Sequence, residues 1–130
     1  MIFNAVVVDD DRASATAISR LLARLGCKVV VCTDAQQAVA PALADDVDLV
    51  SLDISMPALD GYEVLSLIRS HEHTRRAPSV PVIAITGKVA GADRAVTLAA
   101  GFAAHLGKPV MLAGLERALR RVAALRGELY

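Results

Sequence analysis

Short apolar segments alternate with segments of helical periodicity along the whole chain. The apolar segments are expected to form strands at Ala5–Val8, Lys28–Cys32, Val47–Leu52, Pro81–Ile85 and Phe102–Leu106. Between them, apolar residues recur with the spacing of one helix face, as at Ile18, Leu21, Leu22 and Leu25. Strands that alternate with helices in this way predict an α/β domain, in which helices cover both faces of a parallel sheet.

Glycine and aspartate mark the ends of several elements. Gly26 and Gly101 are expected to end helices, because glycine readily adopts the left-handed backbone conformation found at helix C-termini. Asp34 is expected to cap a helix that runs to about Leu43, since its side chain can accept from the first free backbone N–H groups.

The middle of the chain contains a turn and a polar stretch. Pro57 and Gly61 are expected to bracket the turn, and the helix after it points Val64 and its apolar neighbours inward. The stretch from His71 to Ser79 is polar and is expected to form a surface loop. An Ala-rich helix then runs from Ala92 to Ala100.

Composition and charge narrow the class of protein. Hydrophobic residues make up 55% of the 130 residues, enough for the core of one domain. Lys plus Arg and Asp plus Glu number 14 each, and this zero net charge argues against electrostatic binding to nucleic acid or anionic membranes. No apolar run approaches the ~20 residues of a membrane helix. Cys27 and Cys32 would lie roughly 16 Å apart on one strand, too far for a disulfide, so a cytoplasmic location is expected.

Polar residues stand at the predicted carboxyl ends of four strands. They are Asp9, Asp10 and Asp11 after the first strand, Asp53 after the third, Thr86 after the fourth and Lys108 after the fifth. Ligands of open parallel sheets bind at this edge, so we expect these side chains to form one site. An acidic triplet alone could merely cap a helix, and Lys108-Pro109 alone could be a turn. Their combination with Asp53 favours a site.

These residue types suit phosphoryl transfer. Clustered carboxylates raise one another's pKa, and Mg²⁺ relieves this conflict by accepting carboxylate and carbonyl oxygens as ligands. Aspartate is a nucleophile that forms aspartyl phosphates. Lys108 would bring a positive charge to a phosphoryl oxygen, and Thr86 a hydrogen-bond donor.

Four strings of the sequence carry a family resemblance. Val-Val-Asp-Asp-Asp, Leu-Asp-Ile-Ser-Met-Pro-Ala-Leu-Asp-Gly, Ile-Ala-Ile-Thr-Gly and Leu-Gly-Lys-Pro-Val occur in this order, each at the end of a predicted strand. Together they resemble the signature of the response-regulator receiver domains of two-component signalling. The resemblance covers essentially the whole chain and implies a single receiver domain over residues 1–130. It also implies a doubly wound, flavodoxin-like α/β fold with a five-stranded parallel sheet of order 2-1-3-4-5.

The resemblance implies roles for individual residues. Asp53 would accept a phosphoryl group from a histidine kinase or histidine phosphotransfer protein. Asp10 and Asp53 would bind Mg²⁺ directly with the backbone carbonyl of Ser55, and Asp9 would hold a metal-bound water. Thr86 and Lys108 would contact the phosphoryl group, and the Lys108–Pro109 bond would be cis.

The resemblance also implies that the domain is a signalling phosphoacceptor and not an enzyme. Such a domain assists its own phosphorylation and dephosphorylation. Its output surface would be the fourth helix, fifth strand and fifth helix, which a downstream protein would recognise.

Three positions depart from the commonest family pattern. His105 stands where Tyr or Phe is usual, Gly87 where Ala is common, and Gly107 where a larger apolar residue is usual. His105 is expected to act with Thr86 in the switch. Its ring either packs inward in the neutral form on activation, because burial disfavours the imidazolium, or stays outward as a partner contact.

Three alternative functions would each require a different set of residues. An aspartate-nucleophile phosphatase would resemble a pattern with a second Asp two residues after the nucleophile, where this chain has Ser55. A flavodoxin-like flavin carrier needs a first loop that cradles a phosphate, which three aspartates would repel. A phosphorylation-independent binding module of receiver fold would not need the catalytic residues, all of which are present.

Overall fold

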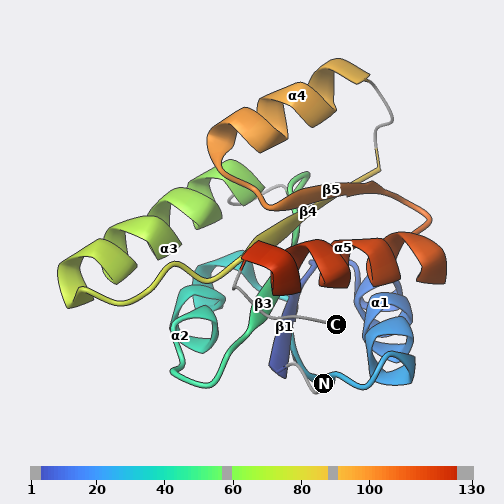
Figure 1. The fold of residues 1–130 in the computed structure, drawn as a ribbon, viewed down its shortest axis with the longest axis horizontal. Coiled ribbons are helices and arrows are strands. Elements are labelled where there is room, and N and C mark those ends of the chain that lie inside the picture. The colour runs from blue at the N-terminus through green and yellow to red at the C-terminus, as the bar shows by residue number, and fades with distance from the viewer. Residues whose placement is uncertain (1–3, 57–59, 88–90, 126–130) are drawn as a thin grey trace.

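The computed structural model describes residues 4–56, 60–87 and 91–125, and Figure 1 shows their arrangement. The elements in chain order are β1 (Asn4–Val8), α1 (Arg12–Arg24), β2 (Lys28–Cys32), η1 (Ala35–Gln37, a 3-10 turn), α2 (Val39–Ala42), β3 (Leu49–Asp53), α3 (Gly61–Arg75), β4 (Val82–Thr86), α4 (Gly91–Ala100), β5 (Ala104–Gly107) and α5 (Leu112–Leu125). The strands form one five-stranded sheet of order β2-β1-β3-β4-β5, and all pairs are parallel. The predicted fold class and strand order are confirmed.

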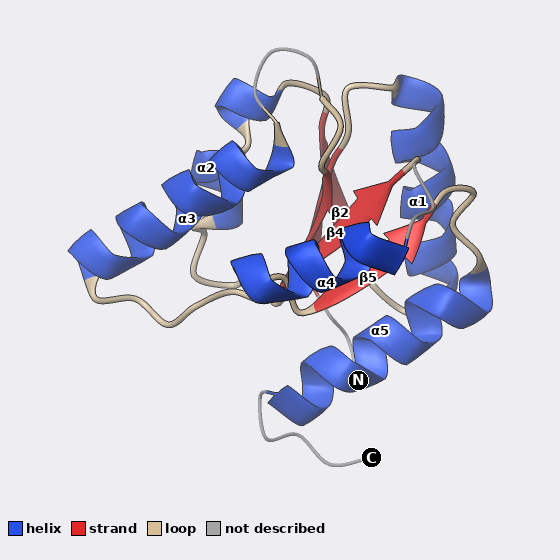
Figure 2. Cartoon of the chain, turned by 90° about the horizontal axis from the view of Figure 1, so that it is seen from above, coloured by secondary structure: helices blue, strands red, loops and turns tan. Residues whose placement is uncertain are grey.

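Helices lie on both sides of the sheet, as the view from above shows (Figure 2), and apolar side chains pack into one layer on each side. Ala5 and Val7 of β1 face a layer built with α1 and α5, which contribute residues such as Leu22 and Leu115. Val6 and Val8 face the opposite layer, which includes Ile68 of α3. Because both faces of the central strands are covered, these strands are continuously apolar in the sequence.

The chain from His71 to Ser79 differs from the prediction of a surface loop. Helix α3 continues to Arg75, and Arg76 ends it in the left-handed conformation with φ 53°. Glu72 is buried although its neighbours in sequence are exposed. It lies four residues after Ile68 and therefore continues the buried stripe of the helix. The loop prediction was therefore wrong for His71–Arg75, where a carboxylate occupies a buried helical position, whereas residues 76–79 do form an exposed segment after the helix.

Polar contacts explain how a carboxylate can be buried there. Glu72 Oε2 accepts a hydrogen bond from the backbone N–H of Val80 at 2.6 Å, and Oε1 accepts one from Arg69 at 2.8 Å. The Arg69 guanidinium also donates to the Val80 carbonyl at 2.9 Å. The end of α3 is thereby joined to the segment that leads into β4.

The second helix is shorter than predicted. Asp34 does act as a cap, because its side chain accepts from the Gln36 N–H at 2.9 Å, but it caps the 3-10 turn η1. Helix α2 follows as a separate, single turn from Val39 to Ala42. Pro41 lies inside this turn and has no N–H to donate, which disfavours one continuous helix.

Smaller differences concern element ends. Strand β3 begins at Leu49 and includes Asp53, and β5 begins at Ala104. Phe102, the predicted start of that strand, precedes it and packs its ring against Tyr62 at a centroid distance of 5.7 Å. Gly26 and Gly101 have φ of 94° and 108°, as expected of residues that end helices.

Gly61 begins α3 where two backbone segments meet. A Cβ atom on Gly61 would lie 2.5 Å from Ile54 Cα, so glycine is needed for this approach. Pro57, the other predicted end of this turn, lies outside the described residues.

Two further predictions can be compared with the structure. Cys27 and Cys32 are not joined by a disulfide. None of the helices in the described ranges combines the length and the apolar character that a bilayer crossing requires.

Candidate functional site

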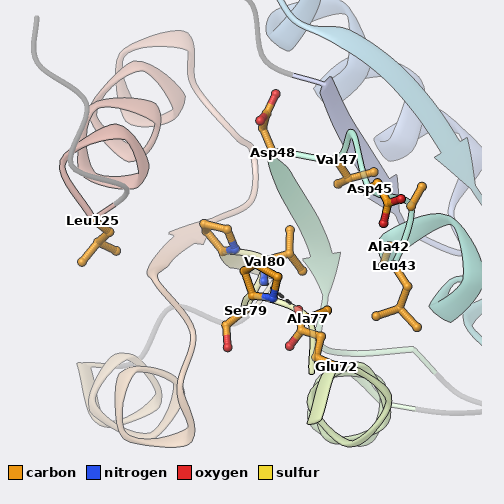
Figure 3. A pocket seen from close by; sticks show the side chains of 13 residues that line it. Ala42, Leu43, Asp45, Val47, Asp48, Glu72, Ala77, Ser79, Val80 and Leu125 are labelled. Carbon is orange, nitrogen blue, oxygen red and sulfur yellow. Dashed lines mark hydrogen bonds between the residues drawn. The ribbon is translucent and has the colours of Figure 1, made fainter. Parts of the chain in front are cut away.

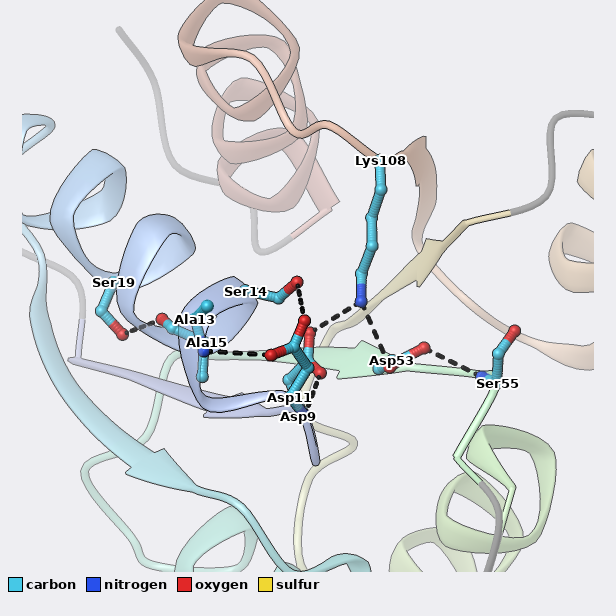
Figure 4. A network of polar contacts seen from close by, with 9 residues as sticks. All are labelled: Asp9, Asp11, Ala13, Ser14, Ala15, Ser19, Asp53, Ser55 and Lys108. Carbon is cyan, nitrogen blue, oxygen red and sulfur yellow. Dashed lines mark hydrogen bonds and ion pairs between the residues drawn. The ribbon is translucent and has the colours of Figure 1, made fainter.

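The sheet brings Asp9, Asp53 and Lys108 together at its carboxyl edge (Figure 4). Asp9 follows β1, Asp53 ends β3, and Lys108 follows β5. Lys108 Nζ lies 3.0 Å from Asp9 Oδ2 and 3.3 Å from Asp53 Oδ2. The Lys108 ammonium therefore lies between the carboxylates of Asp9 and Asp53, which are 44 residues apart in the sequence.

Asp53 is held in place by the backbone that follows it. Its Oδ1 atom accepts a hydrogen bond from the Ser55 N–H at 2.9 Å, while Oδ2 accepts one from Lys108. The residue is 4% exposed because it ends a strand that lies between β1 and β4. Its carboxylate is thus oriented by contacts on both oxygens.

Asp9 is a buried carboxylate with one incompletely satisfied oxygen. Oδ1 accepts from the Asp11 N–H at 2.9 Å. Oδ2 has no hydrogen-bond donor among the described residues, because its contact with Lys108 has the distance of an ion pair without hydrogen-bond geometry. Such an oxygen remains available to a further positive ligand.

The charges of Asp9 and Lys108 depend on each other. Burial raises the pKa of Asp9, and the nearby Asp53 adds to this, while the Asp11 N–H and Lys108 act in the opposite direction. Burial by itself would lower the pKa of Lys108, but the contacts with Asp9 and Asp53, an ion pair with the first and a hydrogen bond with the second, outweigh it, so the pKa of Lys108 is raised. The lysine therefore stays an ammonium at neutral pH and partly compensates the acidic cluster.

The acidic triplet divides into different roles. Asp10 is exposed, and Asp9, Asp10 and Asp53 each offer a carboxylate oxygen, all within 4.8 Å of one another. Asp11 instead caps α1, where it accepts from the Ala13 N–H at 3.1 Å and from the Ser14 hydroxyl at 3.1 Å. Helix capping, the simpler interpretation of the triplet, is thus correct for Asp11.

The oxygen cluster fits a hard divalent cation. Mg²⁺ prefers a few carboxylate oxygens together with water, and this arrangement combines two buried carboxylates with an exposed one. The Asp9 oxygen without a hydrogen-bond donor supports the fit. That the Ser55 carbonyl is a further ligand stays a prediction.

Thr86 ends β4 at the same edge of the sheet. It is buried, and its carbonyl accepts a hydrogen bond from the Lys108 N–H at 2.7 Å. The Lys108–Pro109 peptide bond is cis, as predicted. The two residues expected to contact a phosphoryl group are therefore joined through their backbones.

His105 has a contact that the sequence did not indicate. Its Nδ1 atom lies 2.8 Å from the hydroxyl of Thr97 on α4. Nothing in the sequence distinguished Thr97 from the other residues of its helix, because the contact depends on how α4 packs on β5.

A groove lies at the opposite end of the sheet (Figure 3). It has a volume of about 460 Å³ and is lined by Asp48, which precedes β3, by Pro81, which precedes β4, and by Glu72. None of the predicted site residues lines it. A smaller groove of about 300 Å³ lies beside the site, between Ala13 and Ile18 of α1 and the segment Lys108–Val110.

The model of the response regulator receiver domain family matches residues 5–120 of the chain. The chain belongs to this family. Its receiver sequence is 35% identical over 120 residues to the response regulator MprA of Mycolicibacterium vanbaalenii, covering 92% of this chain and 48% of that protein. It is 32% identical over 118 residues to the hybrid signal transduction histidine kinase G of Dictyostelium discoideum, covering 89% of this chain and 3% of that protein. The chain therefore spans about half, or far less, of the length of these relatives.

Solved structures show the same receiver fold. A response regulator receiver domain protein from Clostridium thermocellum superposes with a TM-score of 0.82 at 22% identity, covering 96% of this chain and 97% of that one. The CheX–CheY–BeF₃–Mg²⁺ complex from Borrelia burgdorferi superposes with a TM-score of 0.78 at 25% identity, covering 95% of this chain and 89% of that one. The receiver domain is a signalling module and no classical enzyme.

Proposed function

We propose that Asp53 is the phosphoacceptor of this receiver domain and takes its phosphoryl group from the phosphohistidine of a histidine kinase or histidine phosphotransfer protein. The observation that carries this proposal is the position of Asp53 beside the Lys108 ammonium, at 3.3 Å, within a cluster of three carboxylates. An aspartate oriented in this way is a nucleophile whose negative surroundings require compensation by cations.

The proposed step is one phosphoryl transfer. An Asp53 oxygen forms the new P–O bond, the P–N bond of the donor breaks, and the imidazole leaves with the bonding electron pair. Mg²⁺ held by Asp9, Asp10 and Asp53 would supply the positive charge that neutralises the phosphoryl oxygens. The B. burgdorferi complex contains BeF₃ and Mg²⁺, which supports Mg²⁺ as the cation.

Lys108 and Thr86 would bind the transferred group. The Lys108 ammonium already lies between Asp9 and Asp53, so it can contact a phosphoryl oxygen on Asp53 with little movement. Thr86 follows Ile85, the partner of Asp53 in the sheet, and would donate its hydroxyl to a second oxygen. The same residues would assist later hydrolysis of the aspartyl phosphate.

The groove beside Lys108 is where the phosphoryl donor protein would dock. Its lining is mostly apolar and includes Ala13, Ala17 and Ile18 of α1. A partner helix that filled this groove would bring its histidine to the carboxyl edge of the sheet. A hybrid signal transduction histidine kinase matches 118 residues of this chain, which supports a histidine kinase as the donor.

The output surface would consist of α4, β5 and α5. Val96 and Leu98 of α4 are 55% and 40% exposed, so this surface offers apolar contacts to a downstream protein. Phosphorylation would reach it through Thr86, which is joined to the segment after β5 by the Lys108 N–H.

The test is phosphorylation by acetyl phosphate with Mg²⁺, followed by intact mass. Wild type should gain one phosphoryl group and Asp53→Asn none, because the nucleophile is gone. Asp11→Asn is the matched control, since Asp11 belongs to the same acidic edge but caps α1. An equal adduct on Asp53→Asn would disprove the assignment, and no adduct on any variant would favour a phosphorylation-independent binding module.

A further inference from the structure

A hydrogen bond joins Thr97 of α4 to His105 of β5. Thr97 Oγ1 lies 2.8 Å from His105 Nδ1, and Thr97 is 0% exposed. A polar side chain this deeply buried is stable only when its hydrogen-bonding groups have partners. The contact is therefore part of how α4 packs on the sheet.

The geometry indicates which group donates. The Thr97 hydroxyl has one proton, and its oxygen also lies 2.9 Å from the Arg94 carbonyl, which can only accept. This bond to the carbonyl three residues earlier is common for threonine in helices. With its proton directed there, the hydroxyl oxygen accepts from the ring, so Nδ1 of His105 carries a hydrogen.

The place of His105 on β5 connects this contact to the phosphoacceptor site. Its neighbours Ala104 and Leu106 pack into the layer of α1 and α5, so strand alternation directs His105 to the opposite face, toward α4. Two residues later, Gly107 pairs with Thr86, and the Lys108 N–H bonds the Thr86 carbonyl. Strand β5 thus contacts the phosphoacceptor site at its carboxyl end, and it contacts α4 through the ring of His105.

We propose that Thr97 is a positioning residue, which accepts a hydrogen bond from Nδ1–H of His105 and thereby makes β5 and α4 respond together when Asp53 is phosphorylated. The hydrogen bond itself does not depend on the proposed function, whereas its effect on signalling rests on it. The imidazole of His105 can make this bond, which a phenylalanine at the same position could not.

Two substitutions separate the hydroxyl from the volume of Thr97. Thr97→Val keeps the branched shape and removes the hydroxyl, and Thr97→Ser keeps the hydroxyl and removes the methyl group. If Thr97 only fills space, the valine variant should behave like wild type. If instead the hydrogen bond positions His105, the serine variant should behave like wild type and the valine variant should not.

The first measurement is the tautomer of His105 in the unphosphorylated protein, from ¹H–¹⁵N NMR correlations of the ring at a pH where it is neutral. Wild type and Thr97→Ser should carry the proton on Nδ1, and Thr97→Val should shift toward Nε2–H. A proton on Nε2 in wild type, or an unchanged tautomer in Thr97→Val, would overturn the proposed contact.

The second measurement is the response of α4 to phosphorylation. Amide shift changes of Leu98, Ala99 and Ala100 are compared among the three proteins at equal phosphoryl occupancy, determined by intact mass. The response should be reduced in Thr97→Val and restored in Thr97→Ser, and an undiminished response in Thr97→Val would overturn the signalling role. If none of the proteins gains an adduct, the proposed function fails and the signalling role with it, while the tautomers still decide the contact.

Discussion

Lys108 Nζ lies 3.0 Å from Asp9 Oδ2, although the two residues follow strands at different positions in the sheet, β5 and β1. The same ammonium also lies 3.3 Å from Asp53 Oδ2, so it stands beside carboxylate oxygens that a cation would also contact. Lysine and metal are therefore expected to compete for the acidic cluster.

Lys108→Ala should keep the fold but bind Mg²⁺ more tightly than wild type, because an ammonium that repels the cation is removed. Isothermal titration with Mg²⁺ measures the affinity. The phosphorylated variant should also transmit less change to α4, β5 and α5, which NMR shift changes at equal phosphoryl occupancy measure. Weaker Mg²⁺ binding, or an unaltered response of that surface, would contradict these expectations.

Asp10→Ala should weaken Mg²⁺ binding and slow phosphorylation strongly, because it removes an oxygen from the cluster. Asp10 is exposed, so thermal stability without metal should change little. Mg²⁺ titration and the rate of adduct formation are the measurements, with Asp11→Asn as the control. If both quantities match those of the control, the metal binds elsewhere.

Glu72→Ala should lower the free energy of unfolding by about 1–3 kcal/mol, since the Val80 N–H loses its buried acceptor. His71→Ala is the control, because His71 is the exposed neighbour on the same helix. Urea unfolding followed by circular dichroism compares them. Equal midpoints for the two variants would show that the Glu72 contacts contribute nothing net.

Gly61→Ala should also destabilise the domain, by about 1–3 kcal/mol, because the added Cβ would overlap Ile54 and force the backbone to move. Gly114→Ala is a contrasting variant in α5, where the added Cβ would meet Leu106 at 3.4 Å, close to an ordinary contact. Replacing a helical glycine there should be neutral or stabilise by up to about 1 kcal/mol. Thermal unfolding of both variants measures the difference, and similar losses in both would rule out the close approach at Gly61.

The sequence by itself determined that the sheet is parallel and which residues stand at its carboxyl edge, while the strand order was predicted only through the family resemblance. Continuous apolar strands separated by helical stripes lead to a parallel sheet, and the carboxyl ends of parallel strands lie at one edge. Asp9, Asp53, Thr86 and Lys108 were therefore predictable as neighbours although the chain separates them widely.

Only the tertiary structure decided the separate roles of Asp9, Asp10 and Asp11. The three consecutive aspartates look alike in sequence, but Asp9 is buried beside Lys108, Asp10 is exposed, and Asp11 caps α1. These roles depend on where the chain turns from β1 into α1, which local composition does not specify.

Tertiary structure also decided the contacts of Glu72 and Thr97. The buried Glu72 is compensated by Arg69 and by the Val80 N–H, and the latter arrives only when the chain folds back toward β4. Thr97 meets His105 only when α4 packs on β5. Sequence patterns report the average polarity of a segment, whereas each of these contacts depends on a single polar partner brought close by packing.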